Sequence, residues 1–256
     1  MKSQSCKRTF NLARDATADA LQSRWNYHGS WQESVFRRDG FKRPVSRGLA
    51  LIAYFSNHAT EQGADYSKFK WDGHYPATGF AGLTRRQGRK PIIAAVNGHA
   101  HGGGFEIALN SDLVLASPNA NFRLPDVLRG TAALEGAFPR ICRTFGLQRA
   151  MLLVLTAYTL HVEEAKEWGL VQKIVPSEKL VEEAVKLAGL IAGMSPDSIV
   201  VSRAGVRQAW ETASVDEAGR MMAEKFAEKL MHGENAREGM LAFAERRAPK
   251  WVPSKL

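Results

Sequence analysis

The 256-residue sequence predicts an α/β fold: a sheet with helical crossovers, followed by a helical C-terminal region. Three observations lead to this prediction. Short apolar runs typical of buried strands lie between residues 90 and 126, a glycine-rich turn leads from the first of them into a helix-like segment, and amphipathic patterns dominate after about residue 146. Strands that alternate with helices in this way favour a sheet with crossover connections.

The strand-like runs follow one another closely along the chain. Residues 90–98, KPIIAAVNG, are rich in β-branched residues and are bounded by a proline and a glycine, which predicts a buried strand. Residues 112–117, DLVLAS, predict a second buried strand, and residues 120–126, ANFRLPD, predict a third short strand that ends at a proline. Between the first two strands, residues 105–111, FEIALNS, have helical spacing.

The C-terminal part of the chain is predicted to be mostly helical. Amphipathic patterns cover residues 147–158 and 182–194, which are separated by residues 167–176. Residues 214–231 and 234–247 predict a pair of charged helices. Their methionine and phenylalanine side chains are typical of a packing face rather than of a cofactor site.

Composition indicates a globular protein with one large domain, or with a domain and an appendage, because 45% of its residues are hydrophobic and 24% are charged. No run approaches the roughly 18 uninterrupted apolar residues of a membrane span, and the N-terminal stretch lacks the apolar core of a secretory signal. The two cysteines, Cys6 and Cys142, form neither a disulfide framework nor a metal-ligand spacing. We therefore expect a protein of a reducing compartment with no membrane partner.

Positive charge is concentrated near the N-terminus. The net charge is +9, and residues 1–50 hold ten Lys or Arg against four Asp or Glu, which is +6 of that total. Such an excess favours polyanionic partners, either nucleic acid or a ligand that carries a nucleotide. Because no nucleic-acid motif accompanies the charge, we expect a solvated surface and no nucleic-acid partner.

The segment from Val96 to Leu109, VNGHAHGGGFEIAL, places three consecutive glycines before a glutamate and a helix-like run. The first backbone N–H groups of such a helix have no intrahelical partner and lie at the positive end of its dipole, so they attract negative charge. Glycines also let the backbone approach a ligand closely. A tight turn from strand to helix is the alternative, although it explains one or two glycines more easily than three.

Three chemistries use a glycine turn of this kind. A phosphate-binding loop needs a lysine after the glycines, and none follows them here. His101 and the glycine triplet resemble the oxyanion loop of lipases, but the chain contains no Gly-x-Ser-x-Gly nucleophile elbow. The third chemistry is an oxyanion hole for a thioester enolate, with an acid or a base nearby.

Residues 89–176, which include KPIIAAVNGHAHGGGFEIALNSDLVLAS and NFRLPDVLRG, resemble the crotonase (enoyl-CoA hydratase/isomerase) superfamily, and fungal peroxisomal members in particular. The resemblance continues more loosely through GLIAGMSPDSIVVSRAGVRQA to EGMLAFAERRAPKW. Order, spacing and residue type agree over more than half of the chain. The resemblance implies a crotonase-like spiral of β-β-α turns with a helical C-terminal region.

The resemblance also implies which residues form the site. The middle glycine of the triplet, Gly103, would donate its N–H to the thioester oxygen, and Glu106 would act as acid or base. Asp126 stands where the family has a second carboxylate, and Ala64, in EQGADYSKF, would donate the second oxyanion N–H. The remaining candidates, which would contact the substrate, are Gly102, Gly104, Asp65 and Glu135.

Hydration of an unsaturated thioester requires groups of these types. Two N–H donors stabilise the charge that builds on the carbonyl oxygen, each by about 3–4 kcal/mol in the transition state. Two carboxylates hold the water and exchange the proton, whereas migration of the double bond needs only one. Asp126 has roughly 1.3–1.5 Å less reach than a glutamate. Either its water sits differently, or Asp126 has a turn or helix-capping role after Pro125.

Three further polar residues leave alternatives open. Glu135 lies in a loop where the family often has a glycine-rich step, so it either contacts substrate or is solvated or structural. His99 and His101 form a His-x-His pair, but no third ligand is evident. We therefore expect both histidines to line a pocket and expect no metal site.

The resemblance divides the chain into an atypical segment over residues 1–62, a crotonase core over residues 63–193 and a helical oligomerisation region over residues 194–256. It implies an enoyl-CoA hydratase or isomerase that forms a homotrimer or hexamer. The implied partner is an acyl-CoA substrate, and no cofactor is expected besides the coenzyme A that is part of this substrate. A catalytically inactive crotonase-like binding or assembly protein is the alternative, because the N-terminal segment matches nothing in the family.

Ser254, Lys255 and Leu256 match the tripeptide that the peroxisomal import receptor reads at a free C-terminus. Pro249 and Pro253 discourage a helix there, so we expect the tail to be extended and accessible. We therefore expect the protein to be imported into peroxisomes, which also house acyl-CoA chemistry.

Overall fold

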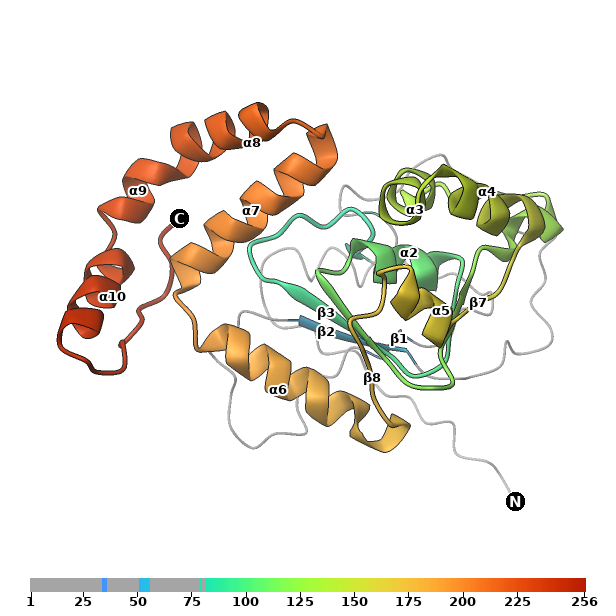
Figure 1. The fold of residues 1–256 in the computed structure, drawn as a ribbon, viewed down its shortest axis with the longest axis horizontal. Helices are drawn as coiled ribbons and strands as arrows, with labels where there is room; N and C mark the ends of the chain where they lie inside the picture. The colour runs from blue at the N-terminus through green and yellow to red at the C-terminus, as the bar shows by residue number, and fades with distance from the viewer. Residues whose placement is uncertain (1–33, 36–50, 56–78, 80–81) are drawn as a thin grey trace, which may run out of the picture. The chain divides into compact units, whose positions relative to one another are not determined.

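The computed structural model describes residues 34–35, 51–55, 79 and 82–256, which belong to two compact units (Figure 1). The first unit consists mainly of residues 94–181, with residues 82–87, and contains the smaller sheet, most of the larger sheet and the candidate site. The second consists mainly of residues 182–256, with residues 88–93, and contains the C-terminal helices.

The larger sheet has five strands in the order β1-β2-β3-β5-β8. Its strands are β1 (Ser34–Val35), β2 (Leu51–Phe55), β3 (Ile92–Val96), β5 (Leu113–Ala116) and β8 (Lys173–Ile174). Strands β1 and β2 are antiparallel, whereas β5 and β8 are parallel, with Leu115 opposite Lys173. Every residue of β3 is buried, which explains its uninterrupted apolar sequence. The strands predicted within residues 90–98 and 112–117 are confirmed.

A smaller sheet carries the residues on either side of the glycine triplet. It has the order β4-β6-β7 and consists of β4 (His99–His101), β6 (Asn121–Arg123) and β7 (Leu160–His161). Strand β4 is parallel to β6, and β6 is antiparallel to β7. The strand predicted within residues 120–126 is confirmed as β6, whereas β4 was not predicted. The glycine triplet therefore begins directly where β4 ends.

Helix α2 (Gly103–Asn110) begins at the second glycine of the triplet and packs into the core of the first unit. Phe105 on its buried face contacts Phe122 of β6, with 5.5 Å between the ring centroids. The buried side chain of Asn110 donates hydrogen bonds from its amide nitrogen to the carbonyl oxygens of Leu83 and Arg86. Within the described residues of this unit, the other helical segments are η3 (Pro125–Arg129), α3 (Ala137–Phe145), α4 (Leu147–Thr156), α5 (Val162–Glu167) and η4 (Ser177–Lys179).

The second unit is helical in its C-terminal part, as the sequence predicts. Its helices are most of α6 (Leu180–Ala192), then α7 (Pro196–Thr212), α8 (Val215–Met222), the π-helical segment η5 (Ala223–Ala227), α9 (Glu228–Met231) and α10 (Glu234–Ala244). Segments α8, η5 and α9 follow one another without a break, so the helix predicted over residues 214–231 is confirmed. Helices α7 and α8 pack side by side, and a Cβ on Gly205 would lie 2.1 Å from the sulfur of Met222.

Helix length and composition bear on membrane insertion. Among residues 79 and 82–256, no single helix is both long and apolar enough to cross a membrane. In this described part of the chain, one pair of segments, Ser177–Ala192 and Pro196–Thr212, reaches the required length and composition when counted together across a sharp bend.

Asn110→Ala should lower the free energy of unfolding by about 1–3 kcal/mol, because two backbone carbonyls lose their donor. The urea midpoint, with an unchanged slope, measures this loss. Asn119, which is exposed, provides the matched control Asn119→Ala, and we expect less than about 0.5 kcal/mol from it. Equal effects of the two substitutions would contradict the structural role of Asn110.

Candidate active site

The glycine triplet begins with a backbone conformation that needs glycine. Gly102 has φ 52° and ψ −121°, a combination that residues with a side chain rarely adopt. Its N–H donates to the carbonyl oxygen of Arg123 at 2.9 Å, and its own carbonyl accepts the N–H groups of Phe105 and Glu106. The tight-turn interpretation therefore explains Gly102.

The two glycines that follow start helix α2. Gly103 and Gly104 occupy its first turn, where backbone N–H groups have no partner within the helix. These groups lie at the positive end of the helix dipole. The geometry expected of an oxyanion donor is thus available at Gly103, one residue after the strained position.

Glu106 lies in the first turn of α2 and is buried, with 4% of its surface exposed. Its Oε1 accepts the backbone N–H of Ala137 at 3.2 Å. Burial, and to a smaller extent the negative charges of Glu135 and Asp126, raise the pKa of the Glu106 carboxyl from 4.5 to a net value of about 7. Hydrogen bonds from the backbone of Ala137 and Glu135 lower it in part. A carboxyl with this pKa can both accept and donate a proton near neutral pH.

Asp126 lies in η3, and its backbone and side chain serve different purposes. Its carbonyl oxygen accepts the N–H of Gly130, as well as the N–H and the hydroxyl of Thr131. Its side-chain Oδ2 is buried, and no group among the described residues donates a hydrogen bond to it. The carboxylate also raises the pKa of Glu106. The structure therefore brings Asp126 and Glu106 into one electrostatic environment.

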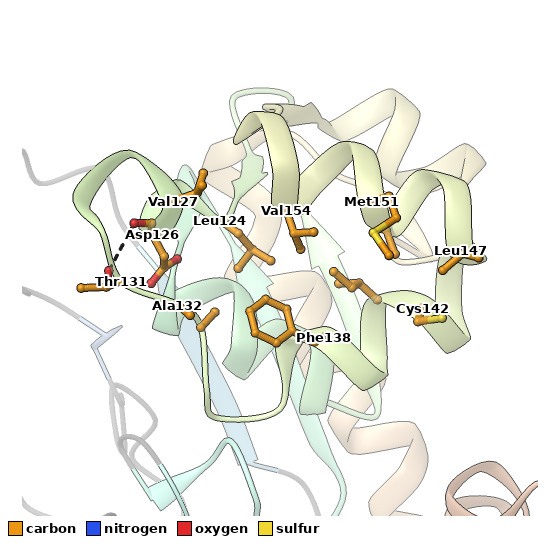
Figure 2. Close-up of a pocket in the computed structure, with 13 residues that line it drawn as sticks. Leu124, Asp126, Val127, Thr131, Ala132, Phe138, Cys142, Leu147, Met151 and Val154 are labelled. Carbon is orange, nitrogen blue, oxygen red and sulfur yellow. Dashed lines mark hydrogen bonds between the residues drawn. The ribbon is translucent and has the colours of Figure 1, made fainter. Parts of the chain in front are cut away.

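A cavity of about 400 Å³ opens beside Asp126, between η3, α3 and α4 (Figure 2). Among the described residues that line it, Asp126 is the only charged one. The others are Leu124, Val127, Thr131, Ala132, Ala133, Phe138, Ile141, Cys142, Leu147, Ala150, Met151 and Val154. Glu106 is not part of this lining. The arrangement suits an apolar group that enters the cavity and presents a polar or reactive end to Asp126.

Glu135 is buried, with 2% of its surface exposed, so the structure excludes the solvated alternative. Its Oε2 accepts the hydroxyl of Thr84 at 3.2 Å, and its Oε1 accepts Nη2 of Arg85 at 3.1 Å. Sequence reasoning missed Thr84, Arg85 and the N–H of Ala137. The first two precede the segment that carries the resemblance, and the third is a backbone group that leaves no signal in a sequence.

His99 and His101 both contact the Asn121 side chain, which lies on the neighbouring strand. Oδ1 of Asn121 is 2.7 Å from Nε2 of His101, and Nδ2 of Asn121 is 2.8 Å from Nδ1 of His99. Burial lowers the pKa of His101. Across the described part of the chain, no group of three or more His, Cys, Asp or Glu side chains is arranged to hold a metal ion. Neither histidine belongs to the cavity lining in Figure 2.

Two candidates, Ala64 and Asp65, lie outside the described residues. The second oxyanion N–H therefore stays a prediction, as does a substrate contact by Asp65. The roles of Gly103, Gly104 and Glu135 towards substrate also stay predictions.

The chain matches the family model described as enoyl-CoA hydratase/isomerase over residues 59–253. Mevalonyl-coenzyme A hydratases of Aspergillus fumigatus and Beauveria bassiana are 48% and 43% identical, and the matches cover 70% and 72% of this chain. The same matches span about two thirds of those relatives, 67% and 66%. Carnitinyl-CoA dehydratase of Proteus mirabilis is 35% identical over 70% of each chain.

Two solved structures of enoyl-CoA hydratases are also similar to this chain in fold. An enoyl-CoA hydratase from Mycobacterium tuberculosis has a TM-score of 0.70 at 30% identity and covers 82% of this chain and 88% of its own. An enoyl-CoA hydratase subunit from Geobacillus kaustophilus has a TM-score of 0.61 at 35% identity, with coverages of 65% and 64%.

Glu106→Gln should change the pH dependence of stability. Folding raises the pKa of Glu106 from 4.5 to about 7. The stability that the protonated, neutral carboxyl contributes is therefore complete below about pH 4.5, and it is lost as the pH rises through about 7. Glutamine stays neutral throughout, so the variant should gain about 3 kcal/mol over the parent between roughly pH 4 and pH 8. Urea unfolding at each pH measures the difference, with the exposed Glu178→Gln as control. A difference independent of pH would contradict the raised pKa.

Proposed function

Because the chain belongs to the enoyl-CoA hydratase/isomerase family, we propose that it adds water to, or removes water from, the acyl group of an acyl-CoA thioester. The family resemblance and the crotonase-type fold predicted from the sequence are confirmed. The expected enzyme class is confirmed at the level of the family, whose similar members are named as hydratases and dehydratases. The observation that carries the proposal is the buried Glu106, with a pKa of about 7, in the first turn after the glycine loop.

In the proposed reaction, each group acts where charge or a proton moves. The N–H of Gly103, together with that of Ala64, stabilises negative charge on the thioester oxygen. Glu106 exchanges the proton at the α carbon, and Asp126 orients the water that bonds to the β carbon. In the reverse direction the same groups remove the α proton and release the β hydroxyl as water. Double-bond migration uses Glu106 alone. The reaction uses no cofactor besides the coenzyme A of the substrate.

The first substrate to test is mevalonyl-CoA. Two relatives named for this substrate are more than 40% identical to the chain. The cavity in Figure 2 supports a short branched acyl group, because its lining is apolar apart from Asp126 and Thr131. A branched apolar part would occupy the cavity while the reacting carbon and its hydroxyl face Asp126.

We also propose that the protein forms a homotrimer or hexamer through its C-terminal helices. Large apolar side chains of this region are exposed: Val215 by 84%, Phe243 by 87% and Val206 by 71%. Soluble proteins rarely leave several such side chains to water on one region unless a partner covers them.

We propose that the protein is located in peroxisomes and that it is imported through Ser254, Lys255 and Leu256. Lys255 is exposed, as a receptor-read tail requires, although each of the three residues has partners in the second unit. Nη2 of Arg89 donates to the Ser254 hydroxyl and carbonyl, and Lys255 contacts Glu234. These contacts are at the surface and therefore weak, so the tail can exchange them for a receptor.

Glu106→Gln should lower kcat by about 100-fold or more, because the general acid–base group is lost. Hydration and dehydration are followed by the absorbance of the conjugated thioester, with crotonyl-CoA and with the unsaturated and hydroxylated mevalonyl thioesters. Retention of parental turnover on every accepted substrate would overturn the role of Glu106. Complete absence of turnover in the parent would overturn the proposed function.

Asp126→Asn tests the proposed role of the second carboxylate. Hydration should fall more than isomerisation, since only hydration needs two groups to manage one water. Equal retention of both activities would assign Asp126 to the turn alone.

A fluorescent fusion at the N-terminus should appear in puncta together with a peroxisomal marker. Deletion of Ser254 to Leu256 should disperse it, because the receptor reads only that terminal tripeptide. Arg89→Ala, which removes a surface contact of the tail, is the control and should leave the puncta in place. Diffuse fluorescence with the tail intact would contradict peroxisomal import.

A further inference from the structure

Glu135 is a buried carboxylate near Glu106 that the proposed reaction does not use. Its two oxygens accept hydrogen bonds from Thr84 and Arg85, and Thr84 is itself fully buried. Gly79 packs closely against Thr84 and Glu135, because a Cβ on Gly79 would lie 2.2 Å from the Thr84 hydroxyl and 2.7 Å from Oε2 of Glu135. An ionisable group that is buried and surrounded in this way costs stability unless its partners compensate it. Thr84 and Arg85 supply this compensation for the buried charge of Glu135, so the three residues form a specific polar cluster in the first unit.

The backbone next to Glu135 reaches Glu106. Gly136 adopts the left-handed conformation, with φ 104°, and ends the loop before α3. The following residue, Ala137, donates its N–H to Oε1 of Glu106. The carbonyl oxygen of Glu135 accepts Nη1 of Arg140 at 3.2 Å. The loop is thus held at Glu135 by its side chain on one side and by its carbonyl on the other, two residues before the amide that meets Glu106.

The charges around Glu106 also involve this cluster. Glu135 and Asp126 are the carboxylates that act on Glu106, and the N–H groups of Ala137 and Glu135 act in the opposite direction. Arg85 forms an ion pair with Glu135 and is half exposed, at 51%. Arg85 therefore offsets part of the negative charge that Glu135 places near Glu106.

We infer that Glu135, anchored by Arg85 and Thr84, is a positioning residue that holds the 135–137 loop so that the Ala137 N–H orients the Glu106 carboxylate. The inference rests on the proposed function, in which Glu106 moves the proton. In this role Glu135 touches no substrate. Its anchors fix the direction of the catalytic oxygen, and its ion pair adjusts how readily that oxygen accepts a proton.

Two substitutions in the full-length protein give opposite expectations. Glu135→Gln keeps the shape of the side chain but removes a negative charge near Glu106, so the pKa of Glu106 should fall. Arg85→Met leaves Glu135 without its counter-charge, so the pKa of Glu106 should rise. In both variants the loop loses an anchor, and kcat should fall about tenfold or more while KM changes less than about twofold. The exposed Glu163→Gln on α5 is the charge-matched control and should change neither quantity.

Two measurements test the inference. The first is the pH profile of kcat, whose acidic limb should move to lower pH in Glu135→Gln and to higher pH in Arg85→Met. The second is the carboxyl ¹³C NMR titration of Glu106 in the free protein, assigned by the resonance that disappears in Glu106→Gln. Opposite displacements in the two variants, together with the loss of kcat, support the inference.

Other outcomes overturn it. An increase in KM with an unchanged kcat and an unchanged Glu106 titration would make Glu135 a substrate contact. A lowered melting temperature with unchanged kcat and titration would make the cluster structural only. If the parent turns over no acyl-CoA, the proposed function fails, while the titration still decides whether Glu135 and Arg85 control Glu106. If Glu135→Gln does not fold, Arg85→Met decides alone, because Arg85 is half exposed and its loss leaves no large buried cavity.

Discussion

One hydrogen bond joins the two helical starts that make up the candidate active site. The N–H of Ala137, at the beginning of α3, donates to the carboxylate of Glu106, in the first turn of α2, although the residues are 31 positions apart. A buried carboxylate is tolerated only where donors face it, and the open end of a helix supplies such donors. The unusual backbone of Gly102, the left-handed Gly136 and the anchored Glu135 all bring these two helix ends together.

The local elements around the glycine triplet could be predicted from the sequence because each carries its own signal. Strands β3 and β5 are continuous apolar runs, and α2 shows helical spacing. Helix α3 was missed although Ala137, Ile141 and Phe145 are its buried residues at helical spacing. Between them lie a proline and three charged or polar positions, and the glycine-rich step expected there favours a loop. Its Pro139 is tolerated because it lies in the first turn.

The relation between two residues of the site could be predicted from the sequence only where both residues lie in one short segment. The triplet and Glu106 are adjacent in sequence, so their relation follows from helix geometry. The burial of Glu135 is different, because Thr84 and Arg85 lie about fifty positions away and only the fold brings them to it. Asp126 shows a third case. The sequence left a turn role and a catalytic role as alternatives. The structure assigns the turn to the backbone of Asp126, while its side-chain Oδ2 is buried without a donor among the described residues.

The Asn121 amide also determines where the ring protons of the two histidines are. Its Oδ1 accepts from Nε2 of His101, so that nitrogen carries a hydrogen. Its Nδ2 approaches Nδ1 of His99 more closely than its Oδ1 does, 2.8 Å against 3.1 Å, so Nδ1 of His99 is the acceptor. In their neutral forms, His99 therefore carries its proton on Nε2, and His101 has its lone pair on Nδ1. The strand before the glycine triplet thus holds two imidazoles in the same Nε2–H tautomer, with His101 donating to the Asn121 amide and His99 accepting from it. A single amide on the neighbouring strand selects both.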